Sequence, residues 1–451
     1  MSDRTFAGER IVVVGGGIAG RAAARVLAER GAEVRVTEAG RLEPGAVGDL
    51  VAAGVRIDEG GHAPGHLVGA TAVVLSPGVP ESSPVLRWAR ERGIEVWSEL
   101  DVGARLARAP YVAITGTNGK STTTRMVASM MQAAGLDAVA CGNIGHPFSI
   151  AAVDGHEALA VEASSFQLRF HHWLRPRVSA LLNLAADHID WHGSFETYAA
   201  AKRRIFELQT AADDVHVGNA DDPAAARVSN EAPCRTVWFR AAEPREGEVG
   251  LVRGEVVTRL DGEARLGRPP VESAGTRADA AAASAVALSF GLDADAVRDG
   301  LHRTVLLPHR GEEIARAGRV RFLDDSKATN VHAALNALAG RSDVVLIAGG
   351  RSKDADLSPL IDGLPSLAGV VAVGEAAPEL VEVFEGRVPV RTAGSIEDAV
   401  RMAYELAAPA RTVLLAPACA SWDMFHDYAE RGDRFAAAAR ALAQELDRAA
   451  S

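Results

Sequence analysis

A strand, a glycine turn and the start of a helix follow one another in residues 111–124, YVAITGTNGKSTTT. The apolar, β-branched run at residues 111–115 predicts a buried strand, and the stretch from Lys120 onward predicts a helix. Between them we expect a tight turn made by Gly116, Thr117, Asn118 and Gly119. Backbone N–H groups at such a helix start, together with the helix dipole, form a site for an anion. The stretch therefore predicts a phosphate-binding loop.

In that loop the Lys120 ammonium would contact the β- and γ-phosphates of a nucleotide, and the Ser121 hydroxyl would hold Mg²⁺. The spacing departs from the usual G-x-x-x-x-G-K-[ST] motif, because Gly116 lies three residues before Gly119 and not five. The alternative interpretation is an ordinary strand-to-helix turn without a ligand.

The length and charge of the chain limit its class. A chain of 451 residues is too long for one core, so about three domains are expected. The net charge of −11, without a basic run, argues against a nucleic-acid partner. Three cysteines far apart in the sequence fit a reducing compartment. No stretch has the length and apolar character of a signal peptide or membrane span, so we expect a cytoplasmic protein without membrane insertion.

Lysine is rare in this chain, and its positions are informative. Of the 48 basic residues, 44 are arginine, and the four lysines are Lys120, Lys202, Lys327 and Lys353. Lysine offers an amine that can lose its proton or be modified, which a guanidinium group does not. At least three of the four lie in otherwise distinctive stretches, although four lysines can also remain by chance.

The first hundred residues predict a parallel sheet with helices on both faces. Residues 10–17 form an expected strand that runs into Gly15-x-Gly17-x-x-Gly20, and a helix follows through residue 30. A second strand at residues 33–39 contains Thr37 and Glu38. Taken alone, this pattern is a dinucleotide-binding fingerprint, and an NAD-dependent dehydrogenase is one alternative. Further strands are expected at residues 72–78, ending in Ser76, Pro77 and Gly78, and at residues 94–98.

The next unit places acidic and histidine side chains at strand ends. Residues 141–145 (CGNIG) form a glycine-rich loop, and the apolar run at residues 158–164 carries Glu162. A buried acid is costly unless it is paired or binds a metal, and the alternative is a strand-end charge in solvent. A strand at residues 178–184 leads into residues 185–192, whose two aspartates and two histidines fit either a solvated turn or metal ligands equally.

The rest of this unit predicts helices and short strands. A helix at residues 194–208, capped by Ser194, carries Lys202 beside two arginines, and a solvated cationic face is its structural interpretation. Residues 215–222 predict a strand and a turn, and residues 234–260 predict a set of antiparallel hairpins. Helices are expected at residues 279–290 and 294–302, and a hinge at residues 306–310.

The last third of the chain predicts a second doubly wound sheet. Strands are expected at residues 319–325, 343–350, 370–374 and 411–417, and a helix is expected from residue 435. Three strand ends lead into DSKATN (325–330), GGRSK (349–353) and APACAS (416–421). Ligands of open α/β sheets bind at such carboxyl ends. The hydroxyl, amide and cationic groups there suit an anionic substrate.

Taken in order, these motifs resemble those of the Mur ligase family, and most resemble its glutamate-adding branch. The matching stretches are TGTNGKST (115–122), CGNIG (141–145), EASSFQL (162–168), DHIDWH (187–192), AKRRIF (201–206), PHR (308–310), DSKATN (325–330) and PACASWDMF (417–425). The resemblance spans the whole chain. It implies an α/β fold of three domains: a Rossmann-like parallel sheet (1–109), a P-loop ATPase-like mixed sheet (110–307) and a second Rossmann-like sheet (308–451).

The resemblance also implies a reaction, the ATP-dependent addition of glutamate to UDP-N-acetylmuramoyl-L-alanine in peptidoglycan synthesis. ATP would phosphorylate the substrate carboxylate, and the glutamate amine would then attack the acyl phosphate. The implied cofactors are two Mg²⁺ ions and a carbamate on Lys202, which would bridge to a metal. A monomer acting on small molecules is expected, and its domains are expected to close around the acyl phosphate.

Residue roles follow from the same resemblance. Catalytic roles fall on Lys120, Glu162, His188, Lys202 and Lys327, and the implied metal ligands are Ser121, Glu162, His188 and Lys202. The implied ATP contacts are Gly116, Thr117, Asn118, Gly119, Lys120, Ser121, Thr122, Arg310 and Asp325. The sugar nucleotide would contact Gly17, Ile18, Ala19, Thr37, Glu38, Ser76, Pro77, Gly78 and Asn143. Glutamate would contact Thr329, Lys353, Ser421 and Phe425.

Two departures from the family pattern are visible. The family's H-N-x-x-N before the alanine-rich helix is replaced by residues 275–279 (GTRAD), so that Thr276 and Asp279 stand where asparagines are common. Ala19 stands where the first glycine loop commonly has a hydroxyl. The remaining alternatives are an alanine-adding muramate ligase, a folyl-polyglutamate ligase, the dehydrogenase and a non-enzymatic binding protein. The sequence does not distinguish D- from L-glutamate.

Overall fold

The structure is a computed structural model that describes residues 5–269, 273–305, 307–353, 355–408 and 411–450. The chain divides into two compact units. The first comprises residues 1–184, 191–269 and 279–304, and the second comprises residues 185–190, 270–278 and 305–451. The first unit contains two sheets and the second contains one.

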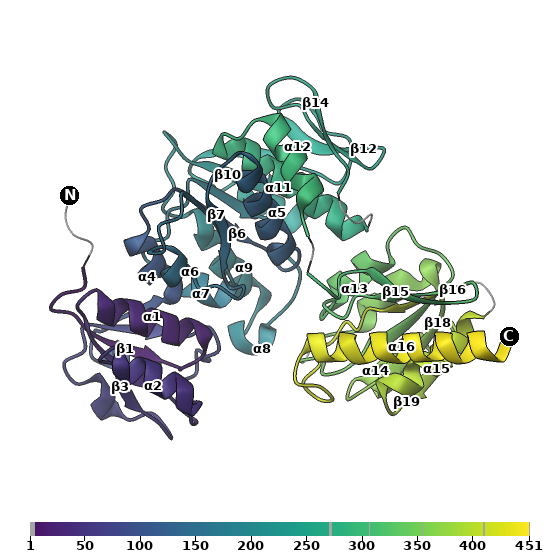
Figure 1. Cartoon of the computed structure of the whole chain (residues 1–451), viewed down its shortest axis with the longest axis horizontal. Coiled ribbons are helices and arrows are strands. Elements are labelled where there is room, and N and C mark those ends of the chain that lie inside the picture. Colours follow the sequence, from purple (N-terminus) through teal and green to yellow (C-terminus); the bar gives the residue numbers. More distant parts are fainter. Residues whose placement is uncertain (1–4, 270–272, 306, 354, 409–410, 451) are drawn as a thin grey trace. The chain divides into compact units, whose positions relative to one another are not determined.

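The described residues form a first sheet of five parallel strands in the order β3-β2-β1-β4-β5. Figure 1 shows this part of the chain in purple, with α1 and α2 beside the strands. Its strands are β1 (Arg10–Val14), β2 (Glu33–Thr37), β3 (Arg56–Asp58), β4 (Ala72–Leu75) and β5 (Glu95–Ser98). Its helices are α1 (Ile18–Glu29), α2 (Pro44–Ala52), η1 (Pro64–Leu67), α3 (Pro84–Glu91) and α4 (Glu99–Leu106).

Alternation along β1 explains why helices cover both faces of this sheet. Ile11 and Val13 pack with residues of α1, α2 and α4, whereas Val12 and Val14 pack with residues of α3 and η1. The chain leaves β1 and β4 toward opposite edges of the sheet. The loops after these two strands therefore border the crevice where ligands of such sheets bind.

The second sheet is mixed and has the order β14-β13-β12-β11-β10-β9-β6-β8-β7 over the described residues. From β7 at one edge through to β12, neighbouring strands of this sheet are parallel. Strands β13 and β14 continue the sheet beyond β12 and are antiparallel to their neighbours. The strands are β6 (Tyr111–Thr115), β7 (Ala138–Gly142), β8 (Ala158–Glu162), β9 (Val178–Leu181), β10 (Val215–Asn219), β11 (Arg235–Phe239), β12 (Glu248–Val252), β13 (Glu255–Thr258) and β14 (Ala264–Gly267).

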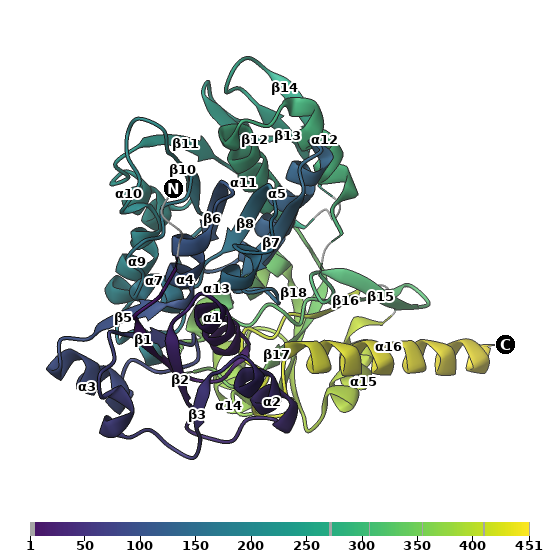
Figure 2. The same cartoon turned by 60° about the vertical axis from the view of Figure 1, so that its left-hand side comes forward.

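Helix α5 (Lys120–Ala133) begins directly after β6 and packs beside β7 and β8 (Figure 2). Strand β6 lies between β8 and β9, so the loop after β6 stands where the strand order changes direction. The other helices are α6 (Phe148–Ala151), α7 (Ser165–Arg169), α8 (Ile189–His192), α9 (Phe195–Arg203), η2 (Arg204–Phe206), α10 (Pro223–Ser229), α11 (Ala274–Phe290) and α12 (Ala294–Arg303).

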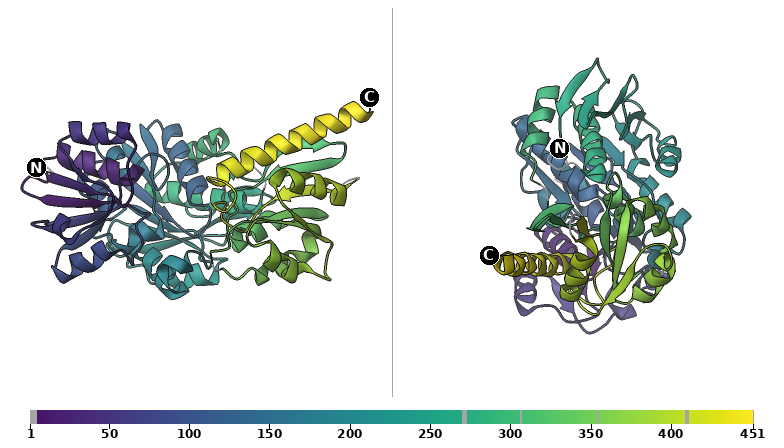
Figure 3. Two further views of the ribbon diagram at one scale, coloured as in Figure 1. Left: turned by 90° about the horizontal axis from the view of Figure 1, so that it is seen from below. Right: turned by 90° about the vertical axis from the view of Figure 1, so that its right-hand side faces the viewer.

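The third sheet has the order β15-β16-β20-β17-β18-β19 among the described residues, and it is parallel except for β15. Its strands are β15 (Glu312–Ala317), β16 (Val320–Asp324), β17 (Val344–Gly349), β18 (Leu367–Val373), β19 (Val390–Ala393) and β20 (Thr412–Leu415). Its helices are α13 (Val331–Leu338), η3 (Ser358–Ser366), α14 (Ala377–Phe384), α15 (Ile396–Ala407) and α16 (Tyr428–Ala450). Helices α15 and α16 pack on one face, and α13 and α14 on the other (Figure 3).

Most predicted elements are confirmed, with one correction in the second sheet. Residues 234–260 were expected to be antiparallel hairpins, but β11 pairs with β12 in parallel and only β12, β13 and β14 are antiparallel. The connection between β11 and β12 folds back over β12, where Leu251 N donates to Ala242 O at 2.8 Å. That return path permits a parallel pair without a crossover helix. Part of the predicted hinge, residue 306, lies outside the described residues.

Four short strands and two helix starts differ from the prediction. Strands β3, β14, β15 and β19 were not predicted, because each is short or strongly charged and lies at an edge of its sheet. Helix α11 begins at Ala274 and not at residue 279, and α16 begins at Tyr428 and not at residue 435. In the parts of the chain that the structure describes, no helix combines the length and apolar character needed to cross a bilayer.

Two buried carboxylates join the first sheet to the second within the first unit. Asp101 accepts hydrogen bonds from the backbone N–H groups of Ser98, His172 and Trp173. Glu99 accepts one from Ser149 N at 2.6 Å. Burial raises the pKa of both carboxyl groups, against the backbone donors that lower it. These contacts hold α4 against α6 and against the segment that follows α7.

Candidate active site

The predicted phosphate loop has the geometry of a strand, a tight turn and a helix start. Gly119 caps α5 in the left-handed region, with φ of +82°. The backbone conformation favours glycine, and a Cβ atom at Gly119 would lie 2.0 Å from Oδ1 of Asp279, so any other residue would also displace the Asp279 side chain. Asp279, which departs from the family pattern, therefore lies directly against the loop.

Two further side chains hold this loop in shape. Lys120 Nζ donates to the carbonyl oxygens of Gly116 and Thr117, at 2.9 and 2.8 Å. The Asn183 side chain accepts from Asn118 N at 2.8 Å and donates to Asn118 O at 3.1 Å. The ammonium group is therefore at the loop, where it can neutralise phosphate charge.

Lys202 is buried beside the phosphate loop, with 1 % of its surface exposed. Its Nζ atom donates to Gly116 O at 2.7 Å and lies 4.7 Å from the centre of the Tyr198 ring. The Tyr198 hydroxyl in turn donates to Thr117 Oγ1 at 2.9 Å. The interpretation of Lys202 as part of a solvated cationic face is therefore wrong: α9 turns this lysine inward, whereas Arg203 remains partly exposed.

Glu162 is also buried, at 2 % exposed, so the solvent-facing alternative for this residue is wrong. It ends β8 next to β6, with Ile114 as its register partner. Oε1 accepts from Asn143 Nδ2 at 2.9 Å, whereas the buried Oε2 has no hydrogen-bond partner among the described residues. A buried carboxylate oxygen without a donor is costly, and a hard divalent cation would satisfy it. The residues present therefore fit a Mg²⁺ ligand at Glu162.

His188 belongs to the second unit, with the short segment 185–190. It takes a left-handed conformation, with φ of 55°, and its Nε2 lies 3.7 Å from Asp187 Oδ2. Asp187 also accepts from Asn330 Nδ2 at 3.1 Å and lies 3.9 Å from Lys353 Nζ. Within the second unit the structure thus brings Asp187 and His188 together with two of the predicted strand-end loops of the third sheet.

The first glycine loop is held in place by hydrogen bonds to Glu38, which follows β2. The Glu38 carboxylate accepts from Gly16 N at 2.7 Å and from Gly40 N at 3.0 Å. Burial raises the pKa of Glu38, but these backbone donors outweigh it and the net shift is downward. Glycine is required at position 15 because its φ is +89°. The carboxylate that a dinucleotide fold uses for a ribose is therefore committed, at least in part, to the loop itself.

Thr37 lies at the same edge and is fully buried. Its hydroxyl is 2.9 Å from Nδ1 of His62 and 2.9 Å from Nδ1 of His66. The two histidines follow β3 and were not predicted as site residues. The sequence could have indicated these histidines only through their position after β3, the strand that pairs with β2.

A small pocket lies next to this loop, between the first sheet and α7. Ser76 and Pro77, which were predicted to contact a sugar nucleotide, line it together with aromatic and amide side chains of the second sheet's loops. Its lining residues are Leu75, Ser76, Pro77, Val79, Ser98, Phe166, Gln167, Phe170 and Trp191. Phe166 and Trp191 form an edge-to-face pair, with ring centres 4.8 Å apart.

In the second unit the three predicted loops follow the adjacent strands β16, β20 and β17. Lys327 Nζ lies 3.9 Å from the centre of the Tyr428 ring, and Lys353 has φ of 56° beside Trp422. Burial raises the pKa of Asp325 to about 7, with Arg310 opposing this rise and Asp324 adding to it. Ser421 is buried, and Phe425 packs into the core, so its aromatic surface is largely covered.

Arg431 is the residue of this unit that sequence analysis missed. It is 1 % exposed and its guanidinium donates to Ser326 Oγ, Ser326 O and Cys419 O at 2.8–3.1 Å. Burial lowers its pKa to about 10. The side chain reaches from the first turn of α16 into two loops at once, and its place in an RGD triplet at the start of an alanine-rich helix was the available signal. It is a positioning residue for those loops.

Comparison with known proteins places the chain in a family. Profiles of Mur ligase domains match its length in three parts: the MurD-like N-terminal domain at residues 9–98, the middle domain at residues 114–252 and the glutamate ligase domain at residues 309–419. A UDP-N-acetylmuramoylalanine–D-glutamate ligase from Frankia casuarinae is 42% identical, over 97% of this chain and 95% of the relative. The chain belongs to the Mur ligase family. A Streptomyces coelicolor protein of the same name is 38% identical to this Mur ligase, over 97% and 99% of the two chains.

Solved structures agree on the fold. A MurC from Thermotoga maritima matches this Mur ligase with a TM-score of 0.58 and 19% identity, covering 94% of this chain and 98% of that one. A MurF from Acinetobacter baumannii matches with a TM-score of 0.59 and 18% identity, covering 90% of each. The expected α/β architecture of parallel, mixed and mostly parallel sheets is confirmed. The dehydrogenase alternative is not supported, since all three domains match the ligase family.

Proposed function

We propose that this Mur ligase adds D-glutamate to UDP-N-acetylmuramoyl-L-alanine with ATP, as a step of peptidoglycan synthesis. The relatives that match it over nearly its whole length carry that activity in their names. The observation that carries the proposal in the structure is the buried pair of Lys202 and Glu162 beside the phosphate loop. A lysine and a carboxylate sequestered there are suited to phosphoryl transfer.

The reaction has two steps. A carboxylate oxygen of the substrate attacks the γ-phosphorus of ATP, the bond to the β-bridging oxygen breaks, and ADP leaves with that electron pair. The glutamate amine then attacks the acyl carbon, phosphate leaves from the tetrahedral intermediate, and the nitrogen loses a proton. The first step collects negative charge on the transferred group, and the second collects it on the carbonyl oxygen, so cationic groups accelerate both.

The chain's own residues would position these groups. Lys120 and the backbone N–H groups of the loop hold the ATP phosphates, and the Ser121 hydroxyl and the unpartnered Oε2 of Glu162 are ligands for Mg²⁺. When bound, Mg²⁺ supplies Lewis-acid neutralisation of phosphate charge. We also propose His188 as a ligand of a second ion, with Arg310, Asp325 and Asp279 near the nucleotide. Lys327, Thr329, Lys353 and Ser421 are proposed to hold the glutamate carboxylates or the reacting groups.

A carbamate on Lys202 is part of this proposal. Its neutral amine would add to carbon dioxide and lose a proton, which converts a buried cation into a carboxylate-like ligand. Support comes from the position of Nζ, 2.7 Å from Gly116 O and 3.5 Å from Thr115 Oγ1. Arginine cannot undergo this reaction. The presence of lysine at this position is therefore informative, because the chain uses arginine for nearly every other cation.

The sugar nucleotide is proposed to bind along the first glycine loop and the adjoining pocket. The proposed contacts are Gly17, Ile18, Ala19, Thr37, Glu38, Ser76, Pro77, Gly78 and Asn143. The pocket next to Ser76 and Pro77 has aromatic walls on its other side, which suit the flat or apolar part of a ligand. We further propose that the protein is cytoplasmic, since ATP and nucleotide sugars are cytoplasmic metabolites. We also propose that it is a monomer.

The test is phosphate release by the purified protein with ATP, magnesium, bicarbonate and the muramoyl-alanine nucleotide. We expect release to require D-glutamate, with L-glutamate at least tenfold less effective. Mass spectrometry of the nucleotide product should show the added glutamate residue. Release that is independent of the muramoyl nucleotide, or that follows L-alanine in place of glutamate, would contradict the proposal.

A further inference from the structure

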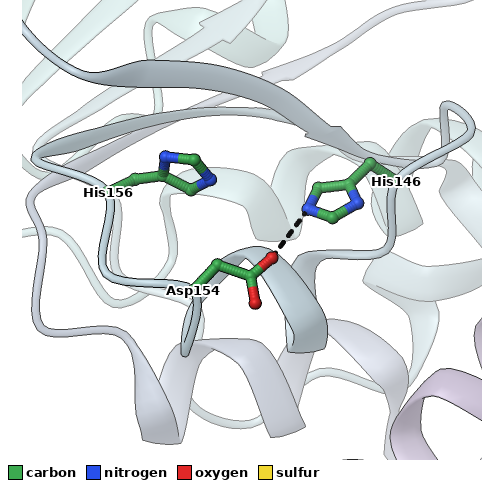
Figure 4. Close-up of side chains that lie close together, drawn as sticks. All are labelled: His146, Asp154 and His156. Carbon is green, nitrogen blue, oxygen red and sulfur yellow. Dashed lines mark ion pairs between the residues drawn. The ribbon is translucent and has the colours of Figure 1, made fainter.

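Two histidines and an aspartate meet at the surface of the first unit, outside the residues assigned to catalysis. His146 follows the loop after β7, and Asp154 and His156 lie in the turn between α6 and β8. His146 Nε2 is 3.3 Å from Asp154 Oδ2. One ligand atom from each of the three residues lies within 4.8 Å of the others, and Figure 4 shows the three side chains around a common space. None of the proposed steps of the ligase reaction uses them.

A fourth residue orients one of these histidines. Asp137 Oδ1 is 3.1 Å from His156 Nδ1, so the carboxylate fixes the proton on Nδ1 and leaves Nε2 as the nitrogen that can bind a metal. Asp137 is itself held, since its N–H donates to Glu157 Oε2 and its carbonyl accepts from Glu157 N, both at 2.8 Å. A carboxylate behind a histidine is the usual outer partner of a metal-binding imidazole.

We propose that His146, Asp154 and His156 bind a divalent transition-metal ion, with zinc as the best match. Two imidazoles and one carboxylate suit zinc, cobalt and nickel better than magnesium or calcium, which prefer oxygen ligands alone. In a tetrahedral zinc site neighbouring ligand atoms are about 3.4 Å apart, as bond lengths near 2.1 Å require. The His146–Asp154 pair already has this separation. Because all three ligand atoms lie within 4.8 Å of one another, His156 needs to approach by at most about 1.4 Å, which its partly exposed side chain permits.

Binding would fix the loop that carries His146. Gly142 N donates to His146 O at 2.8 Å, and Asn143 in the same loop bonds Glu162. An ion shared by residues 146, 154 and 156 would tie this loop to the turn before β8. The metal would therefore stabilise the first unit locally, whether or not the proposed reaction is correct.

The experiment is a titration of tag-free protein with Zn²⁺ and with Co²⁺, in millimolar Mg²⁺ to fill oxygen-ligand sites. We expect one saturable site by calorimetry, and a Co²⁺ visible spectrum without a thiolate charge-transfer band. His156→Ala and His146→Ala should each lower the affinity at least 100-fold. Asp137→Asn should lower it 10- to 100-fold, as loss of an outer-shell carboxylate does. His302→Ala, at an exposed histidine of α12, is the matched control and should bind like the parent protein.

Three outcomes would overturn the proposal. The first is an absence of saturable Zn²⁺ binding, which would leave His146–Asp154 and His156–Asp137 as simple surface pairs. The second is binding that is unchanged in His146→Ala and His156→Ala, and the third is a thiolate band in the Co²⁺ spectrum. Circular dichroism of each variant checks its folding. A failed ligase assay would leave the titration result intact, so the two proposals are tested separately.

Discussion

The two glycine loops of the first unit are built alike and surrounded differently. Each follows a parallel strand at a point where the strand order changes direction, and each starts a helix, α1 or α5. In the first loop the Glu38 carboxylate accepts a hydrogen bond from Gly16 N. In the second loop the Lys120 ammonium donates to two loop carbonyl oxygens, and the buried amine of Lys202 donates to one of the same oxygens. The first loop thus carries added negative charge and the second added positive charge.

This difference decides which ligand group each loop can accept. A triphosphate with its metal ions gains most from the second loop, where cations and a buried acid are arranged together. The first loop can still hold a nucleotide, but one of its amides is already occupied by a carboxylate. The glycine pattern alone therefore identifies a strand-to-helix turn, and the neighbouring charges distinguish the proposed ligand of one loop from that of the other.

The largest expected effect is at Lys202 of the second loop. Lys202→Arg keeps the positive charge but removes the amine on which we propose a carbamate, so we expect activity to fall by about 10³-fold. Lys202→Ala should be equally inactive and partly rescued by short carboxylic acids. Phosphate-release assays measure both, and Arg203→Ala on the same helix is the control that should remain active. Full activity of Lys202→Arg would remove the carbamate from the mechanism.

Replacing the glycine just before the helix by alanine should destabilise the second loop and not the first. Gly119→Ala forces a left-handed φ on alanine and pushes its Cβ into Asp279, so we expect a loss of more than about 1 kcal/mol in unfolding free energy. ATP affinity should fall at least tenfold. Gly17→Ala has an extended backbone and its nearest neighbour at 3.5 Å, so its melting temperature should match that of the parent. Thermal melts and nucleotide titrations measure these effects, and equal destabilisation would contradict the comparison.

Removal of the carboxylate from the first loop should affect only one substrate. Glu38→Ala frees Gly16 N–H and loosens the loop, so we expect about a tenfold rise in KM for the sugar nucleotide, the size of one lost charged hydrogen bond. The KM for ATP should stay within twofold. Steady-state kinetics with each substrate varied in turn provides the measurement. Glu29→Ala, an exposed acid on α1, controls for the change in net charge.

The smallest effect is the pH dependence of stability due to Glu38. Its pKa is lower in the folded protein, so the ionised form stabilises the fold above the unfolded-state pKa, and this contribution disappears as pH falls through the folded-state pKa. Glu38→Gln should therefore destabilise the first unit slightly at pH 7, and the difference should shrink as the pH falls through the folded-state pKa. Urea unfolding of both proteins across this range tests the sign. A difference that grows on acidification would contradict the assignment.

Sequence reasoning succeeded where periodicity and glycine placement determine structure. The strand before Gly116, the helix after it and the strand that carries Glu162 lie where the pattern put them. It failed for short edge strands, since β3 and β19 are too short to show alternation. Their pairing depends on partners far away in the sequence, which local patterns do not contain.

The site was predictable to the same extent. Motifs supplied the residues that we propose contact ligands, but they did not indicate the side chains that hold those residues in place. The burial of Lys202 depends on which face of α9 meets the sheet, and the sequence alone favoured the opposite face. His62 and His66 came to Thr37 only through the pairing of β2 with β3. Arg431 lies a hundred residues from Ser326, and only the fold joins them.

The buried guanidinium of Arg431 has a mechanical consequence. Apolar contacts alone would let a helix slide or rotate on a sheet at little cost. The three hydrogen bonds from Arg431 to two separate turns instead fix both the rotation and the axial position of α16. Because a single planar group bonds both turns, neither can shift without pulling on the other. A displacement of the Ser326 turn would therefore also shift the turn at Cys419, so we expect the two turns to move together.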